Sequence, residues 1–483
     1  MLTPFDTSKL WIGGEWVPSS DGRTLPIENP SSGLTVGAIG RASRDDVDAA
    51  VTAAERALNG PWGALTAFER GRLLSRLSNL VLAHTELLTE LEVADVGKPV
   101  SQARADVVAL ARYLEFYAGA ADKLHGQTIP FLADYTVYTL REPHGVTAHI
   151  IPWNYPMQIM GRSVVGALAA GNAVVVKPAE QASLTSLAFG WLSQQAGFPA
   201  GAINIVPGVG AEAGATLSGH PSIGHVSFTG SFDVGVQIQS AAARHAVPVT
   251  LELGGKSPQI LFDDADLETA LPVLVRAGLQ NAGQTCSASS RILVHRRVHD
   301  HVVEAMSSIY RTLRVGPASA DLDLGPLISA TQKIRVERHL DAARATGAKQ
   351  VATGRIVDEA PEGGHYVAPQ LYTHVNPREP LAQEEIFGPV QVVLPFDEEE
   401  EAVRLANGTP YGLVAGVWTR DAGRQHRLVR QLKAGQVFLN DYGAAGGVEL
   451  PFGGTGHSGH GREKGFEALY GFTKLKTVAA RHR

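Results

Sequence analysis

The sequence of 483 residues contains only one cysteine, Cys286. A single cysteine cannot form an internal disulfide, and such scarcity of thiols is typical of a protein kept in a reducing compartment. A solitary cysteine is more often a small buried hydrophobic residue than a reactive one. Any thiol chemistry must nevertheless use Cys286, so the surrounding motifs have to decide between these two interpretations.

Basic residues are not in excess over acidic ones. The chain has 42 lysines and arginines against 48 aspartates and glutamates, which gives a formal net charge of -6 and a pI near 6.3. Proteins that bind nucleic acids or anionic membrane surfaces usually carry a basic excess. Neither kind of partner is therefore expected.

A hydrophobic run long enough to cross a membrane is also missing. The most apolar stretch, residues 164–176, is shorter than the roughly 20 residues that a span needs, and it contains Asn172. The N-terminal sequence MLTPFDTSKLWIGGEW lacks the basic and then apolar pattern of a signal peptide. These absences predict a cytosolic protein.

The composition that is present predicts a folded protein with more than one core. Hydrophobic residues make up 44% of the chain and charged residues 19%, which is the range of ordinary globular proteins. A length of 483 residues exceeds the roughly 250 to 300 at which a single core stops growing. Two or three packed units are therefore expected.

Between Gly145 and Gly254, short β-branched runs alternate with helical segments, which is the pattern of a parallel sheet with crossover helices. The expected strands are residues 146–151, 173–176, 203–206, 223–228 and 249–253. The expected crossover helices are residues 161–170, 181–196, 211–218 and 232–244. This pattern predicts an α/β unit with a doubly wound sheet.

The rest of the chain contains a helical region, a second α/β unit and an arm. Between residues 44 and 122, apolar residues recur every three or four positions, as in helices packed on a sheet. A second alternation begins after Gln284, with strands at 291–294, 391–394 and 414–417 and a helix at 299–313. Residues 135–142 alternate like an edge strand. A plain surface hairpin is at least as good an interpretation of that strand as a subunit contact.

Candidate site residues follow the ends of the predicted strands, where open parallel sheets bind ligands. Asn154, held between Pro152 and Pro156, could donate its amide hydrogens to an oxyanion, or could bond its own turn. Lys177 and Glu180 follow the second strand, where they could bond the ribose of an adenosine. A glutamate there could equally belong to the first turn of a helix.

Glycines and a carboxylate follow the later strands. Neither glycine cluster, at 208–214 or 230–235, is a dinucleotide fingerprint in its usual place, but the second directly precedes a helix whose N-terminus could hold a pyrophosphate. Glu252 ends the fifth strand and is a candidate general base. Cys286 follows Gly283 farther along the chain. These two side chains could meet where the two units join.

Several motifs, in this order, resemble those of the aldehyde dehydrogenase superfamily, in its non-phosphorylating, hydrolytic branch. The motifs are PWNYP at 152–156, ALAAGN at 167–172, KPAE at 177–180, FTGS at 228–231, ELGGKSP at 252–258, GQTC at 283–286, EEIFGPV at 384–390, PYGL at 410–413 and PFGG at 451–454. Any one of them could occur by chance, but their shared order over nearly the whole chain is not expected by chance.

The resemblance implies the division of the chain. It implies an α/β fold with a Rossmann-like NAD(P)-binding domain at residues 1–121 and 144–253 and an α/β catalytic domain at 254–447. It also implies a small β arm for oligomerisation with a C-terminal segment, at 122–143 and 448–483. The expected assembly is a homodimer or a homotetramer.

The resemblance also implies a role for each site residue. Cys286 matches the nucleophile, Glu252 the base that activates water, and Asn154 an oxyanion donor beside the Cys286 backbone N–H. Residues that match cofactor contacts are Trp153, Lys177, Glu180, Gly210, Gly214, Phe228, Gly230, Ser231, Val234, Leu253, Glu385 and Phe387. NAD is expected rather than NADP because Glu180 would repel a 2'-phosphate, although rotation of its side chain could admit NADP. No metal is expected.

The chemistry follows from the thiol. With a pKa of about 8.5, an unperturbed thiol is only a few per cent ionised at neutral pH, so the site must lower that pKa or supply a base. Attack on an aldehyde gives a thiohemiacetal, loss of hydride to the nicotinamide gives a thioester, and water releases the acid. Two alternatives remain: a relative that transfers the acyl group to coenzyme A, and a structural protein without activity. The presence of Glu252 argues against the first, and its presence together with Cys286 and Asn154 against the second.

Arg162 is a departure from the family pattern, since many relatives have tryptophan there. The resemblance to relatives that oxidise succinic semialdehyde or aromatic aldehydes implies that Arg162 and Tyr155 contact a substrate bearing a carboxylate or an aromatic group. A structural ion pair is nearly as good an interpretation of Arg162. The second arginine of the succinic semialdehyde enzymes is Gln280 here, so the substrate is left open.

Overall fold

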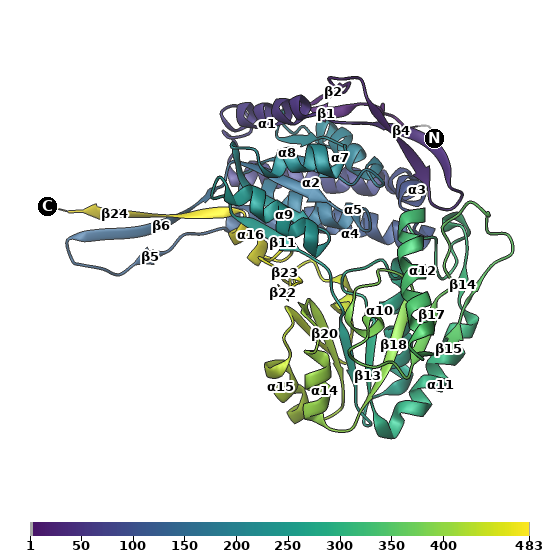
Figure 1. Cartoon of the computed structure of the whole chain (residues 1–483). Coiled ribbons are helices and arrows are strands. Elements are labelled where there is room, and N and C mark those ends of the chain that lie inside the picture. The colour runs from purple at the N-terminus through teal and green to yellow at the C-terminus, as the bar shows by residue number, and fades with distance from the viewer. Residues whose placement is uncertain (1–2, 483) are drawn as a thin grey trace.

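Eight strands form the first sheet of the computed structural model, which describes residues 3–482 (Figure 1). The order is β2-β1-β9-β8-β7-β10-β11-β23, in which the five strands from β9 to β11 run parallel and the outer strands are antiparallel. The bounds are β1 Leu10–Ile12, β2 Glu15–Val17, β7 Val146–Ile151, β8 Ala173–Pro178, β9 Ile203–Ile205, β10 Ile223–Thr229, β11 Val249–Glu252 and β23 Gly459–His460. Residues 1–2, predicted as the start of the NAD(P)-binding domain, and residue 483, predicted as the end of the C-terminal segment, lie outside the described residues.

The parallel strands are where the sequence predicted them. Every residue of β7 and β8 is buried, because helices cover both faces of a parallel sheet and its central strands become continuous apolar runs. From β7 the chain proceeds to β8 and β9 on one side, and then to β10 and β11 on the other. The reversal opens a crevice between the carboxyl ends of β7 and β10, which is where such sheets bind ligands.

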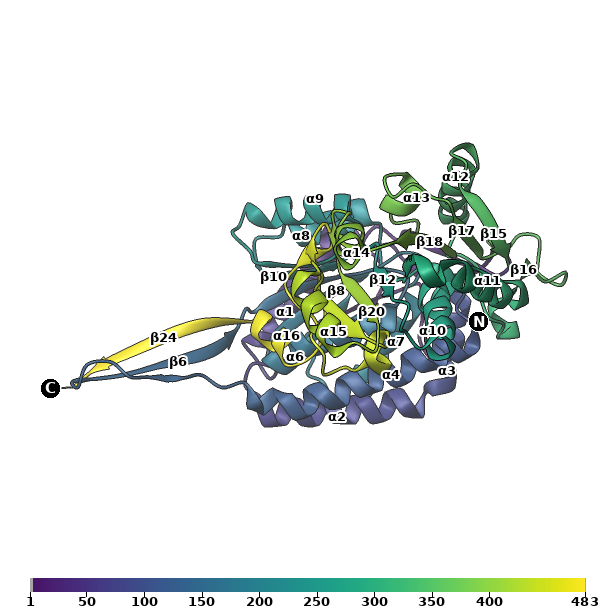
Figure 2. The same cartoon turned by 90° about the horizontal axis from the view of Figure 1, so that it is seen from below.

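The helices beside this sheet form two groups (Figure 2). One group contains α1 (Arg44–Leu58), α8 (Ala215–Ser218) and α9 (Phe232–Ala243). The other contains α2 (Ala67–Ala83), α3 (Thr85–Asp95), α4 (Val100–Ala120), α5 (Pro156–Ile159), α6 (Val165–Ala170) and α7 (Leu184–Gln195). The predicted helices at 161–170 and 211–218 are corrected in one respect. Their first turns, Met160–Val164 and Gly210–Gly214, are π-helical, a local widening that often occurs at functional sites.

A second sheet, in the order β15-β17-β18-β13-β12-β20-β21, is parallel except for the pair β15-β17. Its strands are β12 Pro258–Leu261, β13 Arg291–His295, β15 Lys349–Thr353, β17 Gln370–Thr373, β18 Val390–Phe396, β20 Val414–Trp418 and β21 Gln436–Leu439. Its helices are α10 Leu267–Leu279, α11 Arg296–Thr312, α12 Ala330–Ala345, α13 Pro380–Gln383, α14 Glu399–Ala406 and α15 Ala422–Gln431. The prediction that this unit begins after Gln284 was wrong, because β12 and α10 precede that residue.

Each sheet with its helices forms one body of the molecule, and smaller elements complete the two bodies. The short two-stranded pairs are β3 (Thr24–Asn29) with β4 (Leu34–Gly40), β14 (Arg314–Val315) with β16 (Arg355–Ile356), and β19 (Tyr411–Gly412) with β22 (Thr455–Gly456). The first hydrophobic core also includes Leu469 and Phe472, at the end of the chain near α16 (Glu467–Gly471), whereas the second core is built from residues 260–432. No described helix is long and apolar enough to cross a membrane.

An arm of three strands extends away from both bodies (Figure 1, Figure 2). The predicted strand at residues 135–142 is β6 (Tyr135–Pro143), and it pairs antiparallel with β24 (Thr473–Arg481) along its whole length. A short strand, β5 (Thr128–Ile129), pairs with the other edge of β6. Large apolar side chains are exposed on the arm, namely Ile129, Tyr138, Leu140 and Leu475.

A buried ionic cluster ties α3 and α4 to the loop after β7. The fully buried ammonium of Lys98 lies 2.8 Å from Glu92 Oε1, also pairs with Asp106, and lies 3.9 Å from the centroid of the Tyr155 ring. Gln158 Nε2 donates to the other oxygen of Asp106 at 2.6 Å. Burial raises the pKa of Glu92 to about 7, and the charge of Lys98 opposes that increase. One lysine therefore pairs with two buried carboxylates and packs on one aromatic ring.

We expect Lys98→Met to destabilise the protein by about 3–5 kcal/mol, because the substitution leaves Glu92 and Asp106 buried without their cation. Urea unfolding followed by tryptophan fluorescence measures the effect. Lys123→Met is the control, since the ion pair of Lys123 with Asp122 is exposed. Equal urea midpoints for the two variants would contradict a stabilising role for the cluster.

Candidate active site

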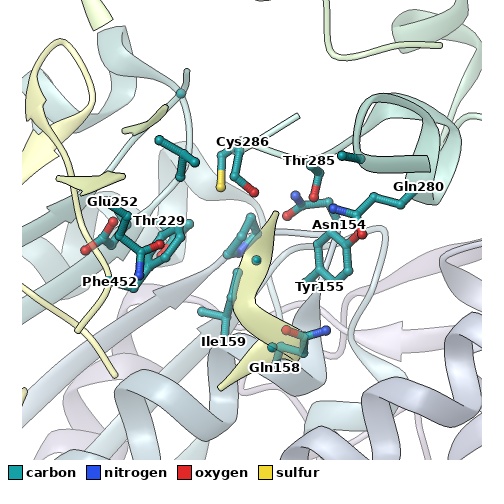
Figure 3. Close-up of a pocket in the computed structure, with 18 of the residues that line it drawn as sticks. Asn154, Tyr155, Gln158, Ile159, Thr229, Glu252, Gln280, Thr285, Cys286 and Phe452 are labelled. Carbon is teal, nitrogen blue, oxygen red and sulfur yellow. The ribbon is translucent and has the colours of Figure 1, made fainter. Parts of the chain in front are cut away.

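A cavity of about 680 Å³ lies at the junction of the two bodies, beside the carboxyl ends of β7, β10 and β11 (Figure 3). The first body contributes Asn154 and Glu252 to its wall, and the second contributes Cys286. Figure 3 shows Cys286 between Glu252 and Asn154 in that view. The three residues predicted to carry the chemistry thus line one cavity.

The backbone around Cys286 is held in a tight reversal. After α10 the chain turns through Asn281 and Ala282, whose φ angles of 48° and 54° are in the left-handed region, and then through Gly283 with φ 75°. Gly255 passes so close that a Cβ on it would overlap the carbonyl oxygen of Cys286. The glycines after Glu252 therefore allow the end of β11 to approach the cysteine.

Two amide side chains join this reversal to the loop after β7. Asn281 Nδ2 donates to the carbonyl oxygen of Asn154 at 2.9 Å, and Asn154 Nδ2 donates to the carbonyl oxygen of Gln284 at 3.0 Å. Asn154 is buried but still lines the cavity. An amide nitrogen carries two hydrogens, so one hydrogen of Asn154 Nδ2 is not used by this bond.

Cys286 is partly exposed in the cavity wall rather than enclosed in a hydrophobic core. Burial raises the pKa of its thiol to about 12, the carboxylates of Glu385 and Glu252 raise it further, and Arg162 opposes them. The protein by itself therefore keeps the thiol protonated at neutral pH. Of the two requirements set by the sequence, a lowered pKa or a base, the site in this form needs the base.

Glu252 ends β11, and only 1% of its surface is exposed. Neither carboxylate oxygen has a hydrogen-bond partner among the described residues. Burial and the nearby carboxylate of Glu463 raise the pKa of Glu252 well above its usual value, while Arg162 opposes the shift. A carboxyl group whose pKa is raised toward neutrality can both accept and release a proton at physiological pH.

Six of the predicted cofactor contacts line the cavity and six lie outside its wall. The lining residues are Trp153, Gly230, Ser231, Leu253, Glu385 and Phe387. The others are Lys177, Glu180, Gly210, Gly214, Phe228 and Val234. Lys177 Nζ lies 3.0 Å from Glu180 Oε2 at the end of β8, so these two side chains form an ion pair.

The start of α9 has the features of an anion site. Ser231 precedes the helix without a side-chain capping bond, which leaves the backbone N–H groups of the first turn free. A Cβ on Gly230 would overlap the ring of Phe228, so a larger residue there would have to displace that ring. Phe387, which also lines the cavity, has φ 57°, and its ring packs edge-on against Trp153 at 5.3 Å between centroids.

Arg162 has features of both predicted roles, a substrate contact and a structural ion pair. It lines the cavity, and its Nε also lies 2.6 Å from Glu463 Oε2 in a buried ion pair. Its guanidinium carbon lies 4.6 Å from the centroid of the Phe452 ring. Tyr155 and Gln280 line the same cavity, and Gln280 Nε2 donates to the Tyr442 hydroxyl at 3.3 Å.

The sequence did not identify the partners that the C-terminal segment supplies. Phe452 belongs to the motif PFGG and lines the cavity, as does Lys464, whereas Glu463 pairs with Arg162. Strand β23, which lies between Phe452 and Glu463 in the chain, pairs with β11. The motif itself was the available signal for the position of these residues. Within residues 3–482 no group of three or more histidine, cysteine or acidic side chains could hold a metal ion.

Residues 16–478 match a model of the aldehyde dehydrogenase family. The chain belongs to this family. The aldehyde dehydrogenase resemblance and the α/β fold predicted from the motifs are therefore confirmed.

Related proteins match over nearly the whole chain. The relative DhaS of Bacillus subtilis (strain 168) is 41% identical over 475 residues, which are 98% of this chain and 95% of the relative. A crystal structure from Burkholderia cenocepacia has 60% identity and a TM-score of 0.98, covering 98% of this chain and 100% of that chain. An NAD+ complex of an aldehyde dehydrogenase from Bacillus cereus has 41% identity and a TM-score of 0.95, covering 99% of this chain and 97% of that chain.

In the protein without ligands, we expect Cys286 to react with iodoacetamide roughly 10²-fold or more slowly than a free thiol at pH 8. A thiol of pKa about 12 has little thiolate at that pH. The rate should increase about tenfold per pH unit up to pH 10. Because the chain has one cysteine, mass spectrometry reports this residue alone, and Cys286→Ala should take no label. A plateau below pH 9 would show that the site lowers the thiol pKa instead.

Proposed function

We propose that this member of the aldehyde dehydrogenase family oxidises an aldehyde to the carboxylic acid with NAD and water, through a covalent intermediate on Cys286. The observation that supports this most is that Cys286, Glu252 and Asn154 line one cavity together with the free N-terminal turn of α9. Related structures from Bacillus cereus and Staphylococcus aureus are NAD+ complexes of aldehyde dehydrogenases.

The residues that would hold NAD fit its parts. The ion pair of Lys177 and Glu180 supplies a cation and an acceptor for the ribose of the adenosine, and Gly230 with Ser231 opens the helix end for the pyrophosphate. Glu385 and Phe387 lie at the nicotinamide end in this proposal. Bound NAD supplies the hydride acceptor for the oxidation.

The protein groups carry out the remaining steps. A base, Glu252 or a water molecule, takes the Cys286 proton, and the sulfur attacks the aldehyde carbon. The oxyanion accepts hydrogen bonds from Asn154 Nδ2 and the Cys286 backbone N–H, and each donor of this kind is worth about 10² to 10³ in rate. After loss of hydride, Glu252 deprotonates the water that attacks the thioester and releases the acid.

Water rather than coenzyme A is the proposed acyl acceptor, because Glu252 lies buried in the cavity with no other hydrogen-bond partner among the described residues. A test aldehyde incubated with NAD and coenzyme A distinguishes the outcomes. Free acid supports the proposal, acyl-CoA supports the acylating reaction, and no NADH with any aldehyde supports a structural role.

Glu252→Gln is expected to lower steady-state turnover by about 10² to 10⁴, because an amide cannot deprotonate the hydrolytic water. Stopped-flow measurement of NADH absorbance separates the first turnover from the steady state. The matched control is Glu304→Gln, whose carboxylate is exposed and lies outside the cavity wall. Steady-state turnover within threefold of the original protein would contradict the role of Glu252 as base.

NAD is proposed over NADP because the Glu180 carboxylate would repel a 2'-phosphate. Glu180→Ser should raise the ratio of kcat/KM with NADP to that with NAD by tenfold or more, since it removes the repulsion and leaves Lys177 unpaired. Steady-state kinetics with both cofactors measure the ratio, with Glu304→Gln again as the control. An unchanged ratio would indicate that Glu180 does not contact the ribose.

The remaining proposals concern the substrate and the assembly. The aldehyde carries a carboxylate or an aromatic group that contacts Arg162 and Tyr155, which both line the cavity.

The two bodies act as an NAD-binding domain and a catalytic domain with the predicted limits. The arm of β5, β6 and β24 joins copies of the chain into a dimer or tetramer, since exposed apolar side chains on a strand edge favour association. A cytosolic location stays a prediction.

A further inference from the structure

A second cation, Lys464, faces the same cavity as Arg162. Its ammonium makes no ion pair within 4 Å in the described part of the chain. The nearest acceptor given to it is the carbonyl oxygen of Gly446, at the long distance of 3.5 Å. Glu449 is the acidic residue whose charge acts on Lys464, but its carboxylate pairs with Arg112 instead. Lys464 is thus a cavity-lining cation without a carboxylate partner.

The backbone holds Lys464 firmly in this place. Glu463 and Phe452 exchange two backbone hydrogen bonds, at 2.8 Å and 2.7 Å, and Gly465 N donates to Val448 O at 2.9 Å. Lys464 between them has φ 63°, in the left-handed region that is unfavourable for a residue other than glycine. Strain of this kind persists where the surrounding bonds fix it, and it is concentrated at binding sites.

The guanidinium of Arg162, which also lines the cavity, has a donor without a partner among the described residues. Only 8% of its surface is exposed, its Nε faces Glu463, and its Nη2 has no hydrogen-bond partner among residues 3–482. A buried donor without an acceptor is unfavourable and is usually satisfied by a ligand or by water. The guanidinium carbon and the Lys464 ammonium lie 4.6 Å and 6.0 Å from the centroid of the same Phe452 ring.

Apolar and aromatic side chains line the cavity that also contains these cations and Cys286. Phe452, Ile159 and Tyr155 lie around the same cavity as the thiol (Figure 3). A molecule bound here would place an anionic group at the cations and a hydrocarbon segment against these side chains. Gln280 is neutral and bonds to Tyr442, so it adds no charge. Arg276 and Arg335 also line the cavity, and Arg335 donates to the carbonyl oxygen of Glu385.

We propose that Lys464 and the Arg162 guanidinium together bind a carboxylate at the end of the substrate remote from its aldehyde group. The substrates are then aldehyde acids with an apolar or aromatic segment between the two groups. This inference rests on the proposed aldehyde oxidation at Cys286, and it replaces the open choice between a carboxylate and an aromatic group with the carboxylate.

Paired substrates test the proposal: 4-carboxybenzaldehyde and 5-oxopentanoate, each compared with its neutral methyl ester. For each pair, kcat/KM is measured with NAD in the original protein, in Lys464→Met and in Lys464→Arg. Lys464→Met keeps an unbranched side chain of similar length and removes only the charge. Arg162 is the poorer target for substitution, because its removal would leave Glu463 buried without a cation. Lys349→Met, at an exposed position of β15 outside the cavity wall, is the control.

The original protein should prefer each acid over its ester. Lys464→Met should lower kcat/KM for the acids by about 10- to 100-fold, mainly through KM, and leave the esters within about threefold, because a charge-assisted hydrogen bond is lost from binding. Lys464→Arg should restore the preference, and Lys349→Met should not alter it. Turnover of the esters also shows that each variant is folded.

Two results would overturn the inference while the proposed function stands. One is oxidation of acids and esters with equal kcat/KM in the original protein. The other is an equal loss of acid and ester turnover in Lys464→Met, which would indicate a structural role for the lysine. Absence of NADH formation from every aldehyde would instead overturn the proposed oxidation, and the carboxylate site with it.

Discussion

The cavity depends on two hydrogen bonds between buried amides where the two bodies meet. Asn281 donates to the Asn154 carbonyl oxygen, and Asn154 donates to the Gln284 carbonyl oxygen. The loop after β7 belongs to the first sheet, whereas Asn281 and Gln284 precede the nucleophile candidate in the second body. Since an unsatisfied buried polar group costs about 1–3 kcal/mol, the two loops have one strongly preferred register. That register sets the position of Cys286 relative to the ligand-binding edge of the parallel sheet.

Burial, more than any single charge, determines the electrostatics inside this cavity. It is the largest cause of the raised pKa of Cys286, Glu252 and Glu385. Arg162 opposes the shift at Cys286 and Glu252, but its charge is largely balanced by the ion pair with Glu463. In the protein alone these acids are therefore biased toward their neutral forms. A cation bound beside the thiol would favour the thiolate, so binding and nucleophile activation are coupled through charge.

The two sheets differ in how well the sequence predicted them. Strands β7 and β8 were predicted correctly because helices cover both of their faces and leave unbroken apolar runs. Strand β12 has only four residues and begins with Pro258, so its pattern was too short to recognise. The predicted start of the second unit therefore lay too far along the chain. The π-helical turn at Met160–Val164 could not be predicted either, because no local pattern distinguishes it from an α-helix.

The sequence by itself determined the family, the alternation of strands and helices, and which motifs follow which strands, because these are properties of neighbouring residues. It also placed Asn154 and Glu252 after strands of one parallel sheet, and it predicted that Cys286 and Glu252 could meet where the two units join. Only the tertiary structure decided that Glu463 pairs with Arg162, that Arg162 and Lys464 lie over the same Phe452 ring, and that the Lys98 ammonium packs on the Tyr155 ring. These partners are far apart in the chain, and side-chain packing, which no local pattern encodes, selects which buried charges meet.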